Sequence, residues 1–429
     1  MEQTAPRFEN SFDLDEPRFE TPARTEEPTP IPRISIQIFC ETPEVTSVME
    51  TAAGDRRMAK AHTKIHMGGI LAATEFYKSA PTPNLIVVES RETADEMLAS
   101  LESLAEVCDS GTKVIVLGRL NDVHLYRELI GRGVAEYLVV PFALLDFLGT
   151  VSRLYHNPET GPLGKTIAFI GARGGCGSST VAHNVAYMIA QTYDSDVVLA
   201  DMDLAFGTAG LDFNQDPPQG IAEAVFSPDR IDDVFLDRLL TKCTDRLSLL
   251  AAPSALDRTY DFEEKTFEAL IDTASQGVPS VILDLPHAWT SWVRHTLSGA
   301  DEIVITASPD LGNLRNAKNL IDFLKAARPN DMSPRLVLNQ VGIPKRPEIK
   351  PEEFAHALEL EPVAIIPFDA HLFGTAANNG QMIAELDGKG IVTPFYAEIA
   401  QTITGRGQVQ RSKKSVLAPI LEKLRGQKG

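Results

Sequence analysis

The chain has 429 residues and a formal net charge of −19, with 43% apolar and 23% charged residues. This length corresponds to two or three domains, the composition excludes a wholly disordered protein, and no stretch approaches the ~18 unbroken apolar residues of a membrane-spanning helix. The acidic balance gives no strong nucleic-acid signal. Four cysteines stand more than sixty residues apart, and the acidic N-terminus lacks an apolar secretory region, so we expect a cytoplasmic protein.

Residues 1–32 contain six prolines and eight acids against three arginines, and they lack a sustained apolar period. This composition predicts a disordered, acidic, Pro-rich tail. The tetrapeptide P-R-F-E occurs in it twice, at residues 6–9 and 17–20. Each copy places one Phe in a polar chain, which is typical of a short docking motif. Chance repetition in a low-complexity segment is the alternative.

Residues 33–155 alternate strand and helix patterns. RISIQIFC, NLIVVES, KVIVLG and EYLVV are short β-branched runs, separated by helical patterns such as GGILAATEFYKS and DVHLYRELIGRG. Strands that alternate with helices predict an α/β fold with a parallel sheet covered on both faces. A Gly- and Pro-bearing stretch at 156–164 then reads as a linker.

Residues 165–404 repeat the alternation on a larger scale. The expected buried strands are KTIAFIGA, DVVLADMD, LSLLAAP, SVILDLP, EIVITASP, RLVLNQV and VAIIPFD. They predict a second, larger α/β domain with a parallel sheet, followed by a separate tail at 405–429.

The stretch GVAEYLVVPF, residues 133–142, resembles the last-strand signature of response-regulator receiver domains, which have a flavodoxin-like fold. The resemblance implies a Lys where Val140 stands, an Asp where Glu89 ends its strand, and a Ser or Thr at Gly118. Without these groups we expect no phosphorylation of this pseudo-receiver. It either serves as a docking or dimerisation surface, with Glu89 mimicking a charged state, or is a degenerate fold kept for packing.

A glycine-rich turn, GARGGCGSST at residues 171–180, lies between the strand KTIAFI and the helical VAHNVAYMIAQ. Glycines let backbone N–H groups encircle phosphates, and the helix N-terminus favours negative charge. Ser178 occupies the lysine position of the usual phosphate-binding loop, while Ser179 keeps a hydroxyl for Mg²⁺. The residues predicted to contact the nucleotide here are Gly171, Arg173, Gly174, Gly175, Cys176, Gly177, Ser178, Ser179 and Thr180.

Polar residues at the ends of the other expected strands accompany this loop. They are Asp201 and Asp203 in VVLADMD, Asp284 in SVILDLP, Asn339 in RLVLNQV and Pro367 in VAIIPFD. Loop and strand ends together resemble the MinD/ParA family of deviant P-loop ATPases over most of residues 165–404. The resemblance implies that ATP and Mg²⁺ bind here.

The resemblance also implies individual roles. Arg173 stands for the family's signature lysine, which crosses a homodimer interface to the partner's nucleotide. Asp201 and Asp284 would serve the metal, together with Ser179, and Asp203 would position the attacking water. Asn339 and the backbone near Pro367 would contact adenine.

The missing lysine normally neutralises charge between the β- and γ-phosphates. Loss of one charge-assisted contact costs about 1.5–3 kcal/mol, which backbone amides, Mg²⁺ and Arg173 can offset for binding. We therefore expect ATP binding with slow or absent hydrolysis because Ser178 stands at this position. A fold that binds no nucleotide is the alternative.

A degenerate receiver followed by a MinD-like domain resembles the CpaE/TadZ proteins of Flp/Tad-type pilus secretion systems, over roughly residues 33–404. The stretches DLPHAWTSWVRHTLSGADEIVITASP and DLAFGTAGLDFNQDPPQGIAEAV carry that likeness. It implies a dimerising assembly and localisation factor with pilus or secretion proteins as partners, at the inner membrane or cell pole. The alternatives are an active MinD/ParA-type ATPase that positions cargo on membrane or DNA, a signalling response regulator, and a nucleotide-free scaffold.

Two further features leave alternatives open. His287, Trp289 and Trp292 follow the strand of Asp284, where the resemblance implies a nucleotide-sensing switch, but both tryptophans also suit a helix core. In the tail, residues 411–425 combine basic residues with an aliphatic stripe at helical spacing. This pattern favours an amphipathic helix on an anionic membrane, a partner-docking helix, or a helix packed on the body.

Overall fold

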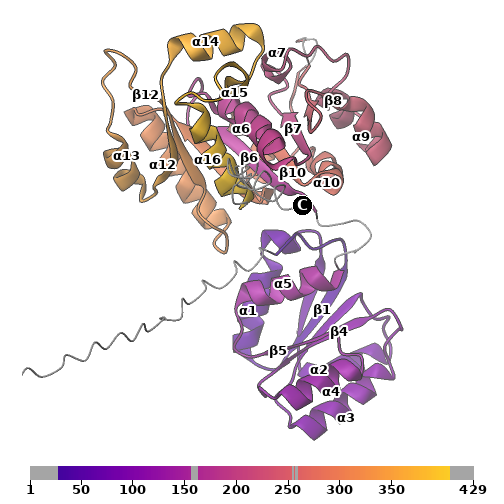
Figure 1. Ribbon diagram of the computed structural model, residues 1–429. Coiled ribbons are helices and arrows are strands. Elements are labelled where there is room, and N and C mark those ends of the chain that lie inside the picture. The colour runs from indigo at the N-terminus through magenta and orange to yellow at the C-terminus, as the bar shows by residue number, and fades with distance from the viewer. Residues whose placement is uncertain (1–27, 156–162, 254–255, 257–258, 406–429) are drawn as a thin grey trace, which may run out of the picture.

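The computed structural model describes residues 28–155, 163–253, 256 and 259–405 (Figure 1). Most of the predicted tails 1–32 and 405–429, namely residues 1–27 and 406–429, therefore lies outside the described residues, as does most of the predicted linker 156–164. Residues 28–32, at the end of the expected acidic tail, pack against the first domain, because Ile31 is buried and the Thr29 hydroxyl hydrogen-bonds Ser152 at 2.6 Å.

The first domain is a five-stranded parallel sheet with the strand order β2-β1-β3-β4-β5, the flavodoxin-like order. Its elements are β1 Ser35–Cys40, α1 Pro43–Ala53, η1 Arg56–Met58, β2 His62–Met67, α2 Gly69–Tyr77, β3 Leu85–Glu89, α3 Ala94–Ala105, β4 Lys113–Gly118, α4 Val123–Gly131, β5 Glu136–Val139 and α5 Leu144–Tyr155. Helices α1 and α5 bury their apolar stripes on one face of the sheet, and α2, α3 and α4 on the other. The predicted two-sided parallel sheet is confirmed.

The second domain is an eight-stranded sheet with the order β13-β12-β11-β6-β10-β7-β9-β8, in which only β8 is antiparallel. Its strands are β6 Lys165–Gly171, β7 Val197–Asp201, β8 Thr241–Lys242, β9 Leu247–Leu250, β10 Ser280–Asp284, β11 Glu302–Ala307, β12 Arg335–Val341 and β13 Pro362–Pro367. Its helices are α6 Ser178–Tyr193, α7 Ala209–Asp212, α8 Ile221–Val225, η2 Pro228–Arg230, α9 Asp233–Leu239, α10 Glu268–Gly277, α11 Ser291–Gly299, α12 Leu311–Ala327, α13 Pro351–Leu358, α14 Ala370–Asn379, α15 Ile383–Leu386 and α16 Thr393–Thr404. The α/β class predicted for both domains is confirmed.

The core of the second domain also has two layers. Helices α6 and α16 bury Val185, Ile189, Tyr396 and Ile399 on one face of the sheet, and helices α10 to α13 cover the other. This stacking places the N-terminus of α6 at the carboxyl end of β6, in the middle of the sheet. The carboxyl ends of parallel strands are where open α/β sheets bind ligands.

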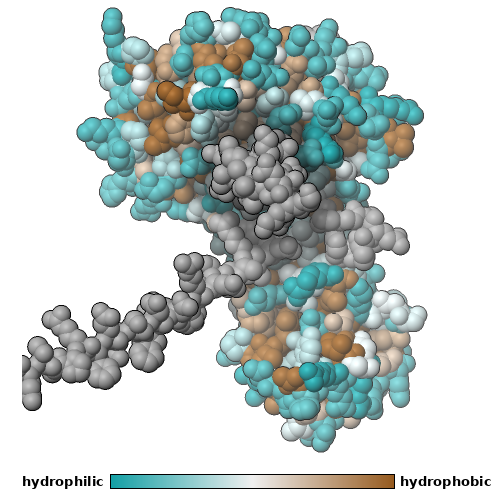
Figure 2. Space-filling model, in the orientation of Figure 1, coloured by the Kyte–Doolittle hydropathy of each residue, from teal (hydrophilic) through white to brown (hydrophobic). Residues whose placement is uncertain are grey.

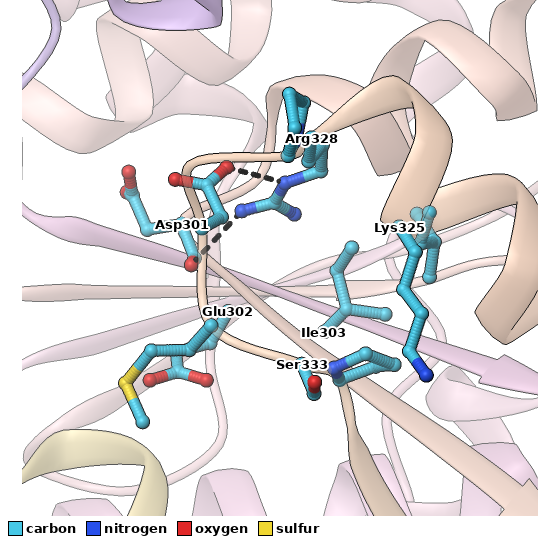
Figure 3. A pocket seen from close by; sticks show the side chains of 11 residues that line it. Asp301, Glu302, Ile303, Lys325, Arg328 and Ser333 are labelled. Carbon is cyan, nitrogen blue, oxygen red and sulfur yellow. Dashed lines mark hydrogen bonds and ion pairs between the residues drawn. The ribbon is translucent and has the colours of Figure 1, made fainter.

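A network of charges joins the two domains at the opposite, amino-terminal edge of the second sheet. Arg56 of η1 binds Asp331 at 2.7 Å and Asp301 at 3.2 Å, and the buried Arg57 also pairs with Asp331. Arg328 binds Asp331 at 2.7 Å and lines a pocket of about 290 Å³ beside this junction (Figure 3). Buried charges that are paired in this way hold one geometry, so the contact fixes how the domains meet.

The surface is largely hydrophilic, with apolar patches on both domains (Figure 2). Among the described residues, no helix is both long and apolar enough to cross a membrane.

Candidate nucleotide-binding site

The glycine-rich loop connects the end of β6 at Gly171 with the start of α6 at Ser178. Gly175 and Gly177 have φ angles of 82° and 86°, which L side chains rarely adopt. A Cβ on Gly177 would also lie 2.4 Å from the Asn339 amide nitrogen. The glycines are therefore required by the shape of the turn.

Four side chains from three neighbouring segments hold the backbone carbonyls of this loop. Each donates a hydrogen bond of 2.9 Å: His287 Nδ1 to Gly171, Asn316 Nδ2 to Ala172, Gln340 Nε2 to Gly175 and Asn339 Nδ2 to Cys176. These hydrogen bonds satisfy the carbonyls of Gly171, Ala172, Gly175 and Cys176. No described group accepts a hydrogen bond from the amides of Gly174, Gly175 or Gly177.

Free amides at the start of a sixteen-residue helix form the kind of site that binds phosphate groups. Ser178 is the first residue of α6, and its hydroxyl is buried without a described hydrogen-bond partner. Ser179 and Thr180 follow in the first turn and are half-buried. An unpartnered buried hydroxyl is unfavourable unless a ligand or water meets it.

Two carboxylates lie side by side on the adjacent strands. Asp284 ends β10 and Asp201 ends β7, and the two residues are direct partners in the strand register. Asp201 accepts hydrogen bonds from the amides of Ala209 at 3.0 Å and Asp203 at 3.2 Å, whereas one oxygen of Asp284 is buried without a described partner. The predicted metal-side carboxylates are thus brought together next to the loop.

A histidine that sequence reasoning did not identify links this pair to α6. His183 is fully buried and donates to Asp212 at 2.8 Å and to Asp284 at 3.2 Å. Burial disfavours the charged imidazole, but the two carboxylates outweigh it and raise the pKa of His183 to about 10. Burial and the charge of Asp284 raise the pKa of Asp201 to about 7. A histidine within an apolar stretch of the helix that follows a glycine-rich loop was the available signal.

Asp203 and Arg173 lie at the mouth of the site. The Asp203 carboxylate accepts from the Phe206 amide at 3.0 Å, and burial raises its pKa. Arg173 is exposed at the tip of the loop near the start of α12, and no described carboxylate pairs with it. Its guanidinium is therefore available to a group outside this chain's described residues.

The predicted adenine contacts are placed differently from one another. Asn339 lies at the loop, where its amide is already used to hold Cys176. Pro367 ends β13, three strands away from β6 in the sheet order, and is half-buried beside Val341. The structure therefore brings Asn339 to the loop and leaves Pro367 at the sheet edge.

The two tryptophans of the expected switch region differ. Trp292 on α11 is 5% exposed and packs on Phe267 with ring centroids 4.6 Å apart, so it is a core residue. Trp289 precedes α11, is 52% exposed and meets the edge of Phe323 at 5.0 Å. The helix-core alternative therefore holds for Trp292 and does not hold for Trp289, and the switch role stays a prediction.

At the carboxyl end of the first sheet, the acidic residue is closed off from a ligand, because groups of the same domain surround and hydrogen-bond it. Glu89 is 1% exposed, and its carboxylate accepts from the amides of Glu41 at 2.7 Å and Thr42 at 2.9 Å and from the Thr42 hydroxyl at 2.7 Å. A Cβ on Gly118 would lie 2.2 Å from the Tyr137 hydroxyl, so Tyr137 fills that space. Glu89 is thus buried and hydrogen-bonded within the first domain, so its side chain is not part of an exposed docking surface, and the docking role of the domain stays a prediction.

Metal binding at the loop would depend on a bound nucleotide. Within the described part of the chain, no three His, Cys, Asp or Glu side chains are grouped to hold a metal ion. Mg²⁺ is commonly held by one or two carboxylates together with phosphate oxygens. Ser179, Asp201 and Asp284 fit that arrangement, since one Asp284 oxygen is unpartnered.

Comparison with known proteins gives three likenesses. No family model matches the chain. The septum site-determining protein MinD of Bacillus subtilis is 23% identical over 276 residues, 60% of this chain and 97% of that protein. A solved ParA family ATPase from Chlorobium tepidum is 23% identical with a TM-score of 0.51, covering 55% of this chain and 98% of its own, which supports the fold alone.

The third likeness is much closer in sequence. The crystal structure of a pilus assembly protein CpaE from Caulobacter crescentus is 48% identical. It covers 30% of this chain and 98% of its own, with a TM-score of 0.30. This likeness depends on the sequence identity, which extends over nearly the whole solved chain, and not on the TM-score.

Proposed function

Because the chain belongs to the family of CpaE pilus assembly proteins, we propose that it is an ATP-binding, dimerising assembly and localisation factor for a Flp/Tad-type pilus secretion system. The observation that carries the nucleotide part is the pairing of a loop with free amides and a buried, unpartnered Ser178 hydroxyl. A scaffold that never bound a ligand would gain stability by filling this space. The pilus part rests on the family.

The residues of the loop divide the work of binding. Amides of Gly174, Gly175 and Gly177 and the N-terminus of α6 would hold the phosphates. Ser179 and Asp201 would hold Mg²⁺, with Asp284 supporting it, and the metal would supply charge neutralisation. Asn339 would act by fixing the loop rather than through its side-chain amide on adenine.

Hydrolysis would be slow or absent. Asp203 would orient a water, but the cation that normally screens the β- and γ-phosphates is replaced by Ser178, whose side chain carries no charge. Arg173, which no described carboxylate pairs, would reach the nucleotide of a second copy. The nucleotide would therefore act mainly as a stabiliser of the dimer.

The place of action would be the cytoplasmic face of the inner membrane or the cell pole. Residues 411–425 lie outside the described residues, and their basic, aliphatic sequence supports reversible attachment to anionic lipid. Dimerisation would double the number of weak anchors and so strengthen attachment.

Sedimentation velocity with and without Mg-ATP tests this function. We expect the wild-type chain to shift from monomer to dimer with Mg-ATP, and Arg173→Ala to stay monomeric while still binding nucleotide. Arg127→Ala, which removes an exposed arginine of the first domain, is the matched control and should dimerise normally. Dimers of equal strength in Arg173→Ala would contradict the role of Arg173, and rapid phosphate release would favour an active ATPase instead.

A further inference from the structure

An apolar groove of about 460 Å³ lies beside the glycine-rich loop. It is on the face of the sheet opposite to α6, the helix that His183 links to Asp284. Its walls come from the segment before α11 and from one face of α12. The side chains that define it are His287, Trp289, Asn316, Asn319, Leu320 and Phe323. His287 and Asn316 also hold carbonyls of the loop, whereas the proposed nucleotide function does not use Trp289, Leu320 or Phe323.

The groove has an exposed aromatic floor. More than half of Trp289 is exposed, whereas Trp292 is buried. The Arg294 guanidinium lies 5.3 Å from the Phe323 ring centroid and 6.0 Å from that of Trp289. Exposed Trp with Arg is the pairing most enriched where proteins bind partners, so this floor is suited to an incoming aromatic side chain.

Two arginines lie next to the groove: Arg294 lies over the Trp289 and Phe323 rings, and Arg315 precedes Asn316 on α12. Arg294 and Arg315 are exposed, and neither pairs with a described carboxylate. Lys318, one helical turn from Arg315, is neutralised by Asp322 at 3.2 Å. In a chain of net charge −19, such a local excess of positive charge selects an acidic ligand.

The chain itself carries a ligand of this chemistry. Residues 1–27, which precede the described part of the chain, contain eight acids and three arginines, and the two P-R-F-E copies present Phe8 and Phe19. We propose that the N-terminal segment 1–27 docks in the Trp289–Phe323 groove, with a P-R-F-E phenylalanine on the aromatic floor and its acids at Arg294 and Arg315.

The length of the segment allows this contact within one molecule. Twenty residues separate Phe8 from Pro28, where the described chain begins on the first domain, and they span up to about 66 Å when extended. A domain the size of residues 165–404 has a radius of gyration of about 18 Å. The first P-R-F-E copy can therefore reach the far edge of the second sheet.

Quenching of tryptophan fluorescence by acrylamide in the full chain tests the proposal. Trp289 dominates the quenching by acrylamide, because Trp292, the other tryptophan, is buried. Replacing both Phe8 and Phe19 by Ala should raise the quenching constant about twofold, since an aromatic anchor carries most of such a contact. Phe12→Ala, which removes the segment's remaining Phe outside both P-R-F-E copies, should leave it unchanged.

Tryptic cleavage at Arg7 and Arg18 gives an independent readout that does not depend on fluorescence. Arg294→Glu should accelerate this cleavage about as much as the double Phe variant does, whereas Arg127→Glu on the first domain should not. Equal quenching and cleavage in all variants would overturn the proposal. The proposal would also be overturned if Trp289 were protected from acrylamide only at high protein concentration and if this protection survived in the double Phe variant. The occupant of the groove would then be a second copy of the chain.

Discussion

Each domain places an acidic residue at the end of a buried central strand. In the first domain the polar atoms at this position are hydrogen-bonded, whereas in the second some of them have no described partner. In the first domain, three donors from the β1–α1 turn satisfy the carboxylate of Glu89, and Tyr137 fills the neighbouring space. In the second, Asp284 and Ser178 each keep a buried polar atom without a described partner, beside amides that are also free. A closed site of this kind stabilises the fold, whereas an open one is suited to a ligand.

The largest predicted effect is the loss of stability of the first domain when the Glu89 carboxylate is removed. Glu89→Ala leaves three buried donors unsatisfied and should lower the stability of the first domain by about 3 kcal/mol or more. Hydrogen exchange in β1 and β3 measures this loss. Glu44→Ala, at an exposed site on α1, should stay within about 0.5 kcal/mol of wild type. A loss below that limit for Glu89→Ala would mean that the site is not closed by its own hydrogen bonds.

The next effect concerns the open site. Ser178→Lys restores the cation to the loop and should tighten Mg-ATP binding by about 1.5–3 kcal/mol, which is about 10- to 150-fold in Kd. Titration calorimetry measures the change, and Ser47→Lys on the exposed face of α1 controls for added charge. Weaker binding in Ser178→Lys would indicate that the space near this hydroxyl does not receive phosphate.

Asp284→Asn should separate the two sites most clearly. It removes a charge that pairs with His183, so the free energy of unfolding should fall, and the Mg²⁺ enhancement of ATP affinity should also drop about tenfold, or about 1.4 kcal/mol. Glu89→Gln should lower stability while leaving nucleotide affinity unchanged. Matching nucleotide affinities of the two variants would contradict the contrast.

The last effect is a dependence of stability on pH. Because the folded pKa of His183, about 10, lies above its ordinary value of 6.5, its ion pairing adds stability that is fully present below pH 6.5 and lost as pH rises through 10. The slope should be on the order of 1 kcal/mol per pH unit. The pKa of Asp201 is raised from 3.8 to about 7, so its ionisation changes the stability between these two pH values.

Urea unfolding at pH 7 and pH 10 measures this slope. His183→Gln should flatten it, whereas His124→Gln, on the exposed start of α4, should not. An unchanged slope in His183→Gln would mean that other groups cause the alkaline loss of stability.

The sequence predicted most of the fold because buried parallel strands are continuous apolar runs. KVIVLG and RLVLNQV coincide with β4 and β12. It did not reveal β2 or β8, since β2 (HTKIHM) is a polar edge strand and β8 has only two residues. Edge strands expose one side to water and so lack the pattern that identifies buried ones.

The candidate site was predictable where residues follow the strand ends and the glycine spacing, as for Asp201 and Asp284. Its supporting contacts were not, because Asn316 and Gln340 meet the loop only through long-range packing. Asn339 illustrates the difference: its position at the loop was foreseen, but its hydrogen bond to Cys176 depends on how β12 lies beside β11 and β6.

The central claim is that the glycine-rich loop binds a triphosphate without the usual lysine. Isothermal titration of the full chain with ATP, in the presence and absence of Mg²⁺, tests it most directly. We expect saturable binding of one ATP per chain that strengthens with Mg²⁺ and disappears in Gly177→Val, whose side chain would collide with Asn339. The absence of any binding heat in the folded wild-type protein, with Mg²⁺ present, would contradict the account.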